Sequence, residues 1–336
     1  MITYADIESS YLLASELDMV VFAAQSTLSL TIKDANNVSV LSCTYTPVDG
    51  AVKVYDLDRL LSSLIVGVMA DFTFVVGSTS QTFHIIQSRT RVNQGAADFI
   101  AGHFLSQVMN CRDTAPGRKE LLTLVATEST DVDAVCTYVD SDNEVHSDTL
   151  NLESNLAAGV HEVDCSPSLL VNDELGTLVY YSVQAGSRIM NYRVSPTQTH
   201  RLALMMRNSF GAWEACYFRG MNEHDAKITR EMVTVGGVQR PLKIEEDDNC
   251  KSWTGPLRPG GVELFRDLAR SQEVMLVEDG FATDAVVVSD ADVKYTDADG
   301  HLPEFTFTWH RASLRTMLKV PTIPRLFDAT FDETFN

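Results

Sequence analysis

The sequence predicts a mainly β protein that consists of tandem β-sandwich domains, a small α+β domain and a C-terminal arm. Short apolar runs of strand length recur along the chain, turn residues such as Asp49-Gly50 separate them, and few segments show the spacing of an amphipathic helix. At 336 residues the chain is longer than a single core usually grows. We therefore expect two or three domains, each with its own core.

Residues 1–115 are predicted to form a β-sandwich with one short helix. Asp56 can cap a helix over residues 56–65, in which leucines at helical spacing form an apolar stripe. The aromatic segment 97–105 shows neither period, so we expect it to be irregular. The strands are expected at residues 20–24, 28–33, 39–45, 72–76 and 81–87.

Residues 116–222 are predicted to form a second sandwich of the immunoglobulin-like or fibronectin-like kind. Its last two strands flank a turn in which Asn208 and Gly211 favour a left-handed backbone. We expect this pair to close the second sandwich, with Phe210 and Trp213 packing domains together. The other strands are expected at residues 121–126, 134–139, 161–163, 178–184 and 190–194.

Residues 223–320 are predicted to form the α+β domain, and residues 321–336 the arm. An acidic loop is expected at residues 245–248, and a helix over residues 262–271 with Val262, Leu264, Phe265 and Leu268 on its apolar face. Strands are expected at residues 232–235, 274–277, 285–288 and 305–309. In the arm, rings recur every four residues and are candidates for contact with a neighbouring subunit: Phe327, Phe331 and Phe335.

The charge balance restricts the partners. The chain has 26 basic and 46 acidic residues, which gives a formal net charge of −20. Such a surface repels nucleic acid and anionic lipid. The first residues show no secretory signal, and the most apolar window, residues 60–70, is too short to span a bilayer. We expect synthesis in a reducing cytoplasm, and no membrane insertion.

No catalytic motif is present, so no catalytic or cofactor residue is assigned and no enzyme activity is expected. The cysteines lack metal-ligand spacing, and Cys136, Cys165 and Cys216 are expected to be small buried side chains. No metal site is assigned. Four carboxylates near one turn resemble a calcium loop but fail the EF-hand pattern, which favours a polar hairpin and leaves cation binding open: Asp290, Asp292, Asp297 and Asp299.

Several local patterns together resemble β-rich proteins that phages and prophages of Bacteroidales encode as tail or virion components. The patterns are Val54-Tyr55-Asp56-Leu57, His103-Phe104-Leu105 followed by Lys119-Glu120-Leu121-Leu122, Asn208-Ser209-Phe210-Gly211-Ala212-Trp213-Glu214, Leu268-Ala269-Arg270-Ser271 and Phe305-Thr306-Phe307-Thr308-Trp309. The resemblance spans most of the chain and implies no catalytic residues. It implies that the protein is made in the host cytoplasm, is located in the virion and assembles into rings or stacks.

We therefore expect a structural protein of a phage tail, baseplate or neck, whose partners are copies of itself and other virion proteins. One alternative is a carbohydrate-binding adhesion module that uses exposed aromatic rings as stacking platforms for a host glycan. The candidate rings for it are Trp213, Trp253 and Trp309. The other alternative is a glycoside hydrolase with a pair of acidic residues.

Overall fold

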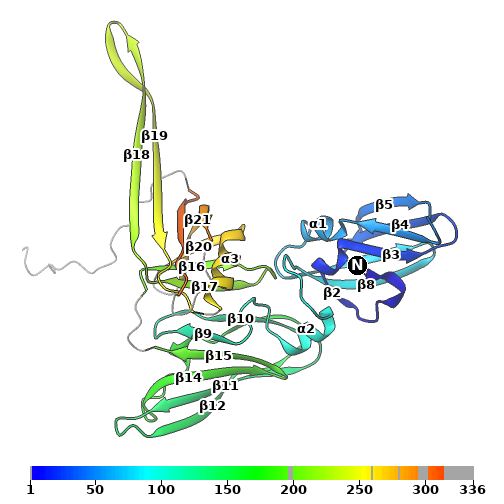
Figure 1. Ribbon diagram of the computed structural model, residues 1–336, viewed down its shortest axis with the longest axis horizontal. Coiled ribbons are helices and arrows are strands. Elements are labelled where there is room, and N and C mark those ends of the chain that lie inside the picture. Colours follow the sequence, from blue (N-terminus) through cyan, green and yellow to red (C-terminus); the bar gives the residue numbers. More distant parts are fainter. Residues whose placement is uncertain (1, 196–199, 259, 279–280, 294–301, 314–336) are drawn as a thin grey trace, which may run out of the picture.

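The computed structural model describes residues 2–195, 200–258, 260–278, 281–293 and 302–313. It is mainly β, as the sequence predicts, and the strands form three units (Figure 1). Two units are sandwiches of paired sheets and the third is one large sheet with a helix, so the predicted fold class is confirmed. Phe327, Phe331, Phe335, Asp297 and Asp299 lie outside the described residues.

The first unit packs a five-stranded sheet, in the order β2-β8-β7-β4-β5, against a three-stranded sheet, in the order β1-β3-β6. Phe22 and Val54 from the smaller sheet meet Phe74 and Phe83 from the larger one in a single buried cluster. The strands are β1 Ile2–Thr3, β2 Tyr11–Leu13, β3 Met19–Ala23, β4 Leu28–Asp34, β5 Ser39–Tyr45, β6 Ala51–Tyr55, β7 Met69–Val76 and β8 Thr79–Ile86. Short 3₁₀ turns span Tyr4–Asp6 and Ala14–Asp18.

The predicted helix of this unit is present as α1, Leu57–Ser62, but Asp56 does not cap it. Asp56 has a left-handed backbone with φ of 58° and makes no side-chain cap hydrogen bond. Leu57 and Leu61 are buried whereas Leu64 is exposed, so the helix presents a narrower apolar stripe than the leucine spacing predicts. The cap prediction is wrong because Asp56 turns the chain sharply from β6 into the helix.

The second unit pairs a five-stranded sheet, in the order β12-β11-β14-β15-β9, with the two-stranded sheet β10-β13. Three tyrosines fill its core, and the rings of Tyr181 and Tyr192 stack at 4.5 Å. The buried hydroxyl of Tyr138 donates to the Leu170 carbonyl at 2.7 Å. The elements are α2 Ala96–Gly102, β9 Cys111–Thr114, β10 Leu121–Ala126, β11 Thr130–Val139, β12 Val145–Leu156, β13 Gly159–Asp164, a 3₁₀ turn Pro167–Leu169, β14 Thr177–Ala185 and β15 Arg188–Val194.

The third unit is a seven-stranded sheet in the order β17-β16-β20-β21-β22-β19-β18, with one helix packed on it. Val262, Phe265 and Leu268 of the helix are buried in the core, as predicted, while Leu264 is half-buried. Phe305, Phe307 and Trp309 are also buried there. The elements are β16 Leu202–Arg207, β17 Trp213–Phe218, β18 Asn222–Val235, β19 Val238–Trp253, α3 Gly261–Arg270, β20 Val274–Glu278, β21 Phe281–Asp292 and β22 Thr306–Arg311.

The sheet topology moves the predicted domain boundaries. Strands β16 and β17 do not close the second sandwich, because β16 pairs with β20 through Leu204 and Leu276 and so belongs to the third unit. The boundary between the second and third units therefore lies before β16 and not at the expected residue 222. The boundary between the first and second units lies before β9 and not at the expected residue 115, since β9 pairs with β15 of the second unit.

Two local predictions are wrong for a similar reason. The segment expected to be irregular contains α2, in which Phe99 and Ile100 pack into a cluster shared with the first unit. The expected acidic loop at residues 245–248 is strand, because the backbone of β19 pairs with β18 through this region. Tertiary packing and cross-strand pairing thus determine the structure of both segments.

The expected burial of Cys136, Cys165 and Cys216 is confirmed, and burial raises the pKa of Cys165 to about 12.

Candidate functional site

The turn between β16 and β17 lies where the three units meet. The side chain of Asn208 shapes it, because its Oδ1 accepts hydrogen bonds from the backbone N–H of Phe210 at 2.9 Å and of Ala212 at 3.1 Å. Gly211 has φ of +74°, and a Cβ there would lie 2.1 Å from the carbonyl oxygen of Gly67 in the first unit. The turn therefore needs glycine for close approach as well as for its backbone angle.

Phe210 and Trp213 join different units. Phe210 is buried and stacks on Phe99 of α2 at 5.2 Å, in a cluster that includes residues of the first unit. Trp213 is half-buried against a cluster that includes Leu121 of the second unit, and the Arg207 guanidinium covers its ring at 4.4 Å. Both side chains therefore pack units of the same chain together. Contact of either with a neighbouring subunit stays a prediction.

A buried polar cluster backs this turn. Glu214 of β17 pairs with Arg112 of β9, and both side chains are almost fully buried. Ser106 Oγ donates to Glu214 Oε1 at 2.7 Å, and Asn208 Nδ2 donates to Glu214 Oε2 at 2.8 Å. The cluster ties the second unit to the third through charge-assisted hydrogen bonds. No local pattern marks Glu214 as buried except its place in a strand of mostly apolar residues.

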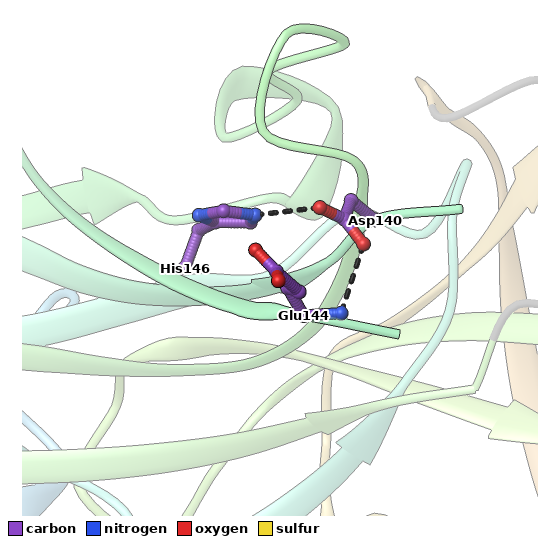
Figure 2. Close-up of side chains that lie close together, drawn as sticks. All are labelled: Asp140, Glu144 and His146. Carbon is purple, nitrogen blue, oxygen red and sulfur yellow. Dashed lines mark hydrogen bonds and ion pairs between the residues drawn. The ribbon is translucent and has the colours of Figure 1, made fainter. Parts of the chain in front are cut away.

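Three potential metal-ligating side chains gather on an exposed hairpin of the second unit (Figure 2). The ligand atoms of Asp140, Glu144 and His146 lie within 4.8 Å of one another. The hydrogen bonds assign Asp140 a structural task, because its Oδ1 accepts from the backbone N–H of Glu144 at 2.9 Å and its Oδ2 lies 2.8 Å from His146 Nε2. Asp140 therefore holds the β11–β12 turn in shape.

The titration of Asp140 tests this role. The hydrogen bond from His146, followed by the one from the Glu144 backbone, lowers the pKa of Asp140. The contribution of this carboxylate to stability is thus present above its unfolded pKa and is lost as pH falls through the lower folded value. We expect His146→Ala to raise the pKa of Asp140 in a carboxyl-detected NMR titration, because it removes the hydrogen bond that is the largest cause of the lowering.

The matched control is His161→Ala, since His161 bonds the Ala157 carbonyl rather than Asp140. An unchanged Asp140 midpoint in His146→Ala would contradict the role assigned to the histidine.

The longest feature of the third unit is the hairpin of β18 and β19, which Figure 1 shows projecting away from the rest of the sheet. Its strands contain 14 and 16 residues, so at about 3.3 Å per residue the ribbon is roughly 45 Å long. Within the described residues, β18 pairs only with β19, and β19 pairs with β22 only at Cys250–Trp253. Most of the hairpin therefore has two edges that no described strand covers.

Large apolar side chains lie exposed on this hairpin. Each retains between 49% and 66% of its surface exposed: Ile228, Met232, Val235, Val238, Leu242 and Ile244. Ile228 and Met232 share a face because they are four residues apart, and Ile244 pairs with Arg230 on that same face. The opposite face carries the cross-strand pairs Glu223–Lys251 and Glu231–Lys243. Ile228, Met232 and Ile244 thus form an exposed apolar group on one face, next to Arg230.

The outer part of the hairpin is also basic. Residues 226–244 contain four basic residues and one acidic residue, a net charge of +3. Because the whole chain carries −20, the remainder carries −23. The outer hairpin and the rest of the molecule therefore carry net charges of opposite sign. The sequence signal for the hairpin is the spacing of Ile228 and Met232, which puts both side chains on one face of a strand among polar residues.

The tryptophan rings that are candidates for stacking on a sugar are buried, half-buried or covered by another side chain. Trp309 is buried and its Nε1 donates to Ser252 Oγ at 2.9 Å. Trp253 is half-buried, with the Lys251 ammonium 5.3 Å from its ring centroid, and Arg207 covers Trp213. The expectation of exposed stacking platforms is wrong for Trp309, because the ring fills the core of the third unit.

Comparisons with known proteins give no family. No family model matches the chain, and no curated protein matches it. Among solved structures it is similar to the BSP domain of a biofilm-associated protein, at 10% identity over 56% of this chain and 29% of that chain, with a TM-score of 0.15. It is also similar to alpha-2-macroglobulin of E. coli, at 10% identity over 80% of this chain and 19% of that chain, with a TM-score of 0.15. The chain thus spans less than a third of either protein.

None of the helices in the described ranges combines the length and the apolar content that a bilayer crossing requires.

Proposed function

We propose that the protein is a non-enzymatic structural subunit of a phage tail, baseplate or neck, which assembles with copies of itself into a ring or stack. The observation that carries this proposal is the projecting hairpin of β18 and β19, with its exposed apolar residues and open edges. Sequence patterns that resemble virion proteins supply the setting. The hairpin supplies the surface for assembly.

Exposure of the apolar side chains of the hairpin to water is unfavourable. An exposed apolar patch on a thin ribbon destabilises the free subunit relative to a state that covers it, and burial of each large apolar side chain gains roughly 1.5–3 kcal/mol. Open strand edges also offer unpaired backbone groups to another chain. Both properties favour a partner on the hairpin.

A second copy of the chain fits the hairpin by charge. The outer hairpin carries +3 and the remaining surface belongs to residues with a net charge of −23, so the hairpin of one copy attracts the body of another. The two surfaces differ, so the contact is heterologous, and a heterologous contact generates a ring if the rotation closes. This matches a tail, baseplate or neck component.

Neutral polar substitution of the exposed apolar side chains tests the proposal. We expect the double variant Ile228→Gln with Ile244→Gln to lose assembly, because it removes two apolar side chains from the contact without changing the charge of the hairpin, while the folded units remain intact. Light scattering after size-exclusion chromatography and negative-stain imaging measure the assembly, and circular dichroism measures the fold. An apparent Kd for self-association weaker by about a hundredfold is expected, since two buried apolar side chains are lost.

The matched control is Thr229→Gln, which makes a neutral polar change on the opposite face of the same strand. We expect this variant to assemble as the unchanged protein does. Assembly of the Ile228→Gln, Ile244→Gln variant at unchanged concentration would exclude this hairpin face as the contact.

A further inference from the structure

A cavity of about 100 Å³ lies between the second and third units, next to the buried pair of Arg112 and Glu214. Strand β9 and the segment after it supply one wall through Asp113 and Arg118. Strand β17 and the segment that leads into α3 supply the other through Tyr217 and Arg258. The cavity is therefore completed only where the two units meet.

The buried guanidinium of Arg118 lines the cavity and has hydrogen-bond donors without a partner. Arg118 is 4% exposed, and its Nε and Nη2 have no hydrogen-bond partner. Its Nη1 donates to the Asp113 carbonyl at 3.3 Å, and its guanidinium lies 4.7 Å from the Tyr217 ring centroid. Unpaired buried guanidinium donors are costly, so an acceptor that enters the cavity gains a strong interaction.

The cavity as a whole is positive. Five arginines and two carboxylates line it, although the chain is strongly acidic. Burial lowers the pKa of Arg118 and the Arg219 charge lowers it further, against the opposite effect of Glu120. Burial and the charge of Arg219 thus both disfavour the Arg118 cation, and an anion that enters beside it offsets this cost.

The entrance combines accessible arginines with apolar side chains. The Arg258 side chain is 52% exposed and pairs with Asp113 at 3.5 Å. Arg219 is exposed. Leu257 and Leu264 line the same cavity. The entrance therefore suits a carboxylate with apolar or aromatic neighbours.

We infer that this cavity binds a carboxylate side chain of the segment 327–336 from a second copy of the chain. This inference rests on the proposed assembly. Residues 327–336 contain Asp328, Asp332 and Glu333 and no lysine or arginine, and the carboxylates alternate with three phenylalanines. A guanidinium binds a carboxylate through two parallel hydrogen bonds, for which Arg118 has the free donors.

The binding of a synthetic peptide of residues 321–336 tests the inference. The full chain is used with Asp328→Asn, Asp332→Asn and Glu333→Gln, so that its own segment competes weakly. Fluorescence anisotropy measures the Kd of the labelled peptide, and a peptide with the same three neutral substitutions is the first control. We expect the neutral peptide to bind at least tenfold more weakly.

Substitutions at the entrance locate the site. We expect Arg219→Gln with Arg258→Gln to weaken binding of the acidic peptide at least tenfold. We expect Arg118→Lys, which keeps the charge but loses the planar fork, to weaken it severalfold. The matched control is Arg266→Gln on α3, an exposed arginine outside the cavity, for which we expect unchanged binding. Circular dichroism checks that each variant is folded.

Each outcome decides between the two proposals. Equal binding of the acidic and neutral peptides, or no binding of either peptide, overturns the inference. Loss of binding in the Arg266→Gln control as well overturns the assignment to the cavity. Assembly that depends on the hairpin in a chain that binds no peptide overturns the inference alone. Peptide binding, together with a chain of unchanged sequence that stays monomeric, overturns the proposed function but leaves the cavity as a site for the acidic segment.

Discussion

Phe210→Ala is expected to lower the free energy of unfolding by about 3–5 kcal/mol, the range for removal of a buried aromatic side chain. Phe210 is 1% exposed and stacks on Phe99, so truncation removes transfer free energy and leaves a void. Its cluster includes Leu13 and Ile86 of the first unit, so the void cannot close without moving one unit against another. The midpoint of urea unfolding measures the change.

The matched control for Phe210→Ala is Phe281→Ala, which makes the same change at a side chain that is 75% exposed. Surface substitutions usually change stability by less than about 0.5 kcal/mol. Equal unfolding midpoints for the two variants would contradict the role of Phe210 at the junction. A selective separation of the first unit, detected by limited proteolysis of Phe210→Ala, would support it.

Arg112→Met is expected to lower the free energy of unfolding by about 3–5 kcal/mol, because it leaves Glu214 buried without its cation. Both side chains are almost fully buried, so solvent cannot replace the lost partner. The double variant Arg112→Met with Glu214→Leu is expected to recover part of this loss, since it removes the unpaired charge but leaves Ser106 and Asn208 without their shared acceptor. Urea unfolding of the unchanged protein, of Arg112→Met and of the double variant measures the loss and its recovery.

An exposed ion pair is the control for the stability loss expected in Arg112→Met. Arg91 pairs with Asp18 at the surface, where 75% of the arginine side chain is exposed. Arg91→Met is therefore expected to cost about 0–1 kcal/mol. A loss for Arg112→Met no larger than that for Arg91→Met would show that the buried pair does not fasten the second unit to the third.

The elements that depend on local pattern are the ones that the sequence predicts well. The strand expected at residues 39–45 is β5 with the same bounds, and the helix expected at residues 262–271 is α3 within one residue at each end. In the helix, the helical spacing of apolar residues coincides with burial, whereas β5 has no buried residue and follows the strand preference of its residues alone. Local chemistry also predicts the turn at Asn208 and Gly211.

The sheet to which a strand belongs is not a local property. Met206 pairs with Val274, which lies far along the chain, and nothing in the apolar run of β16 distinguishes that partner from a neighbour in the second sandwich. Burial of charge is equally hidden, because Glu214 becomes a core residue only when β9 brings Arg112 to it. The arginine-lined cavity likewise arises where segments distant in the sequence meet. The hairpin is a pairing of consecutive strands around Gly236-Gly237, but the acidic run at residues 245–248 within its second strand favours a loop in the sequence.

The way in which the hairpin enters the third unit determines how it bears mechanical load. Strand β19 runs without a break from the outer hairpin into the sheet, where Cys250–Trp253 pairs with Thr306–Trp309. A pull along the hairpin therefore shears these ladder hydrogen bonds together, since they lie perpendicular to the strands, rather than opening them one at a time. The hairpin therefore resists a pulling force through its pairing with β22, whose Trp309 is buried in the core of the third unit.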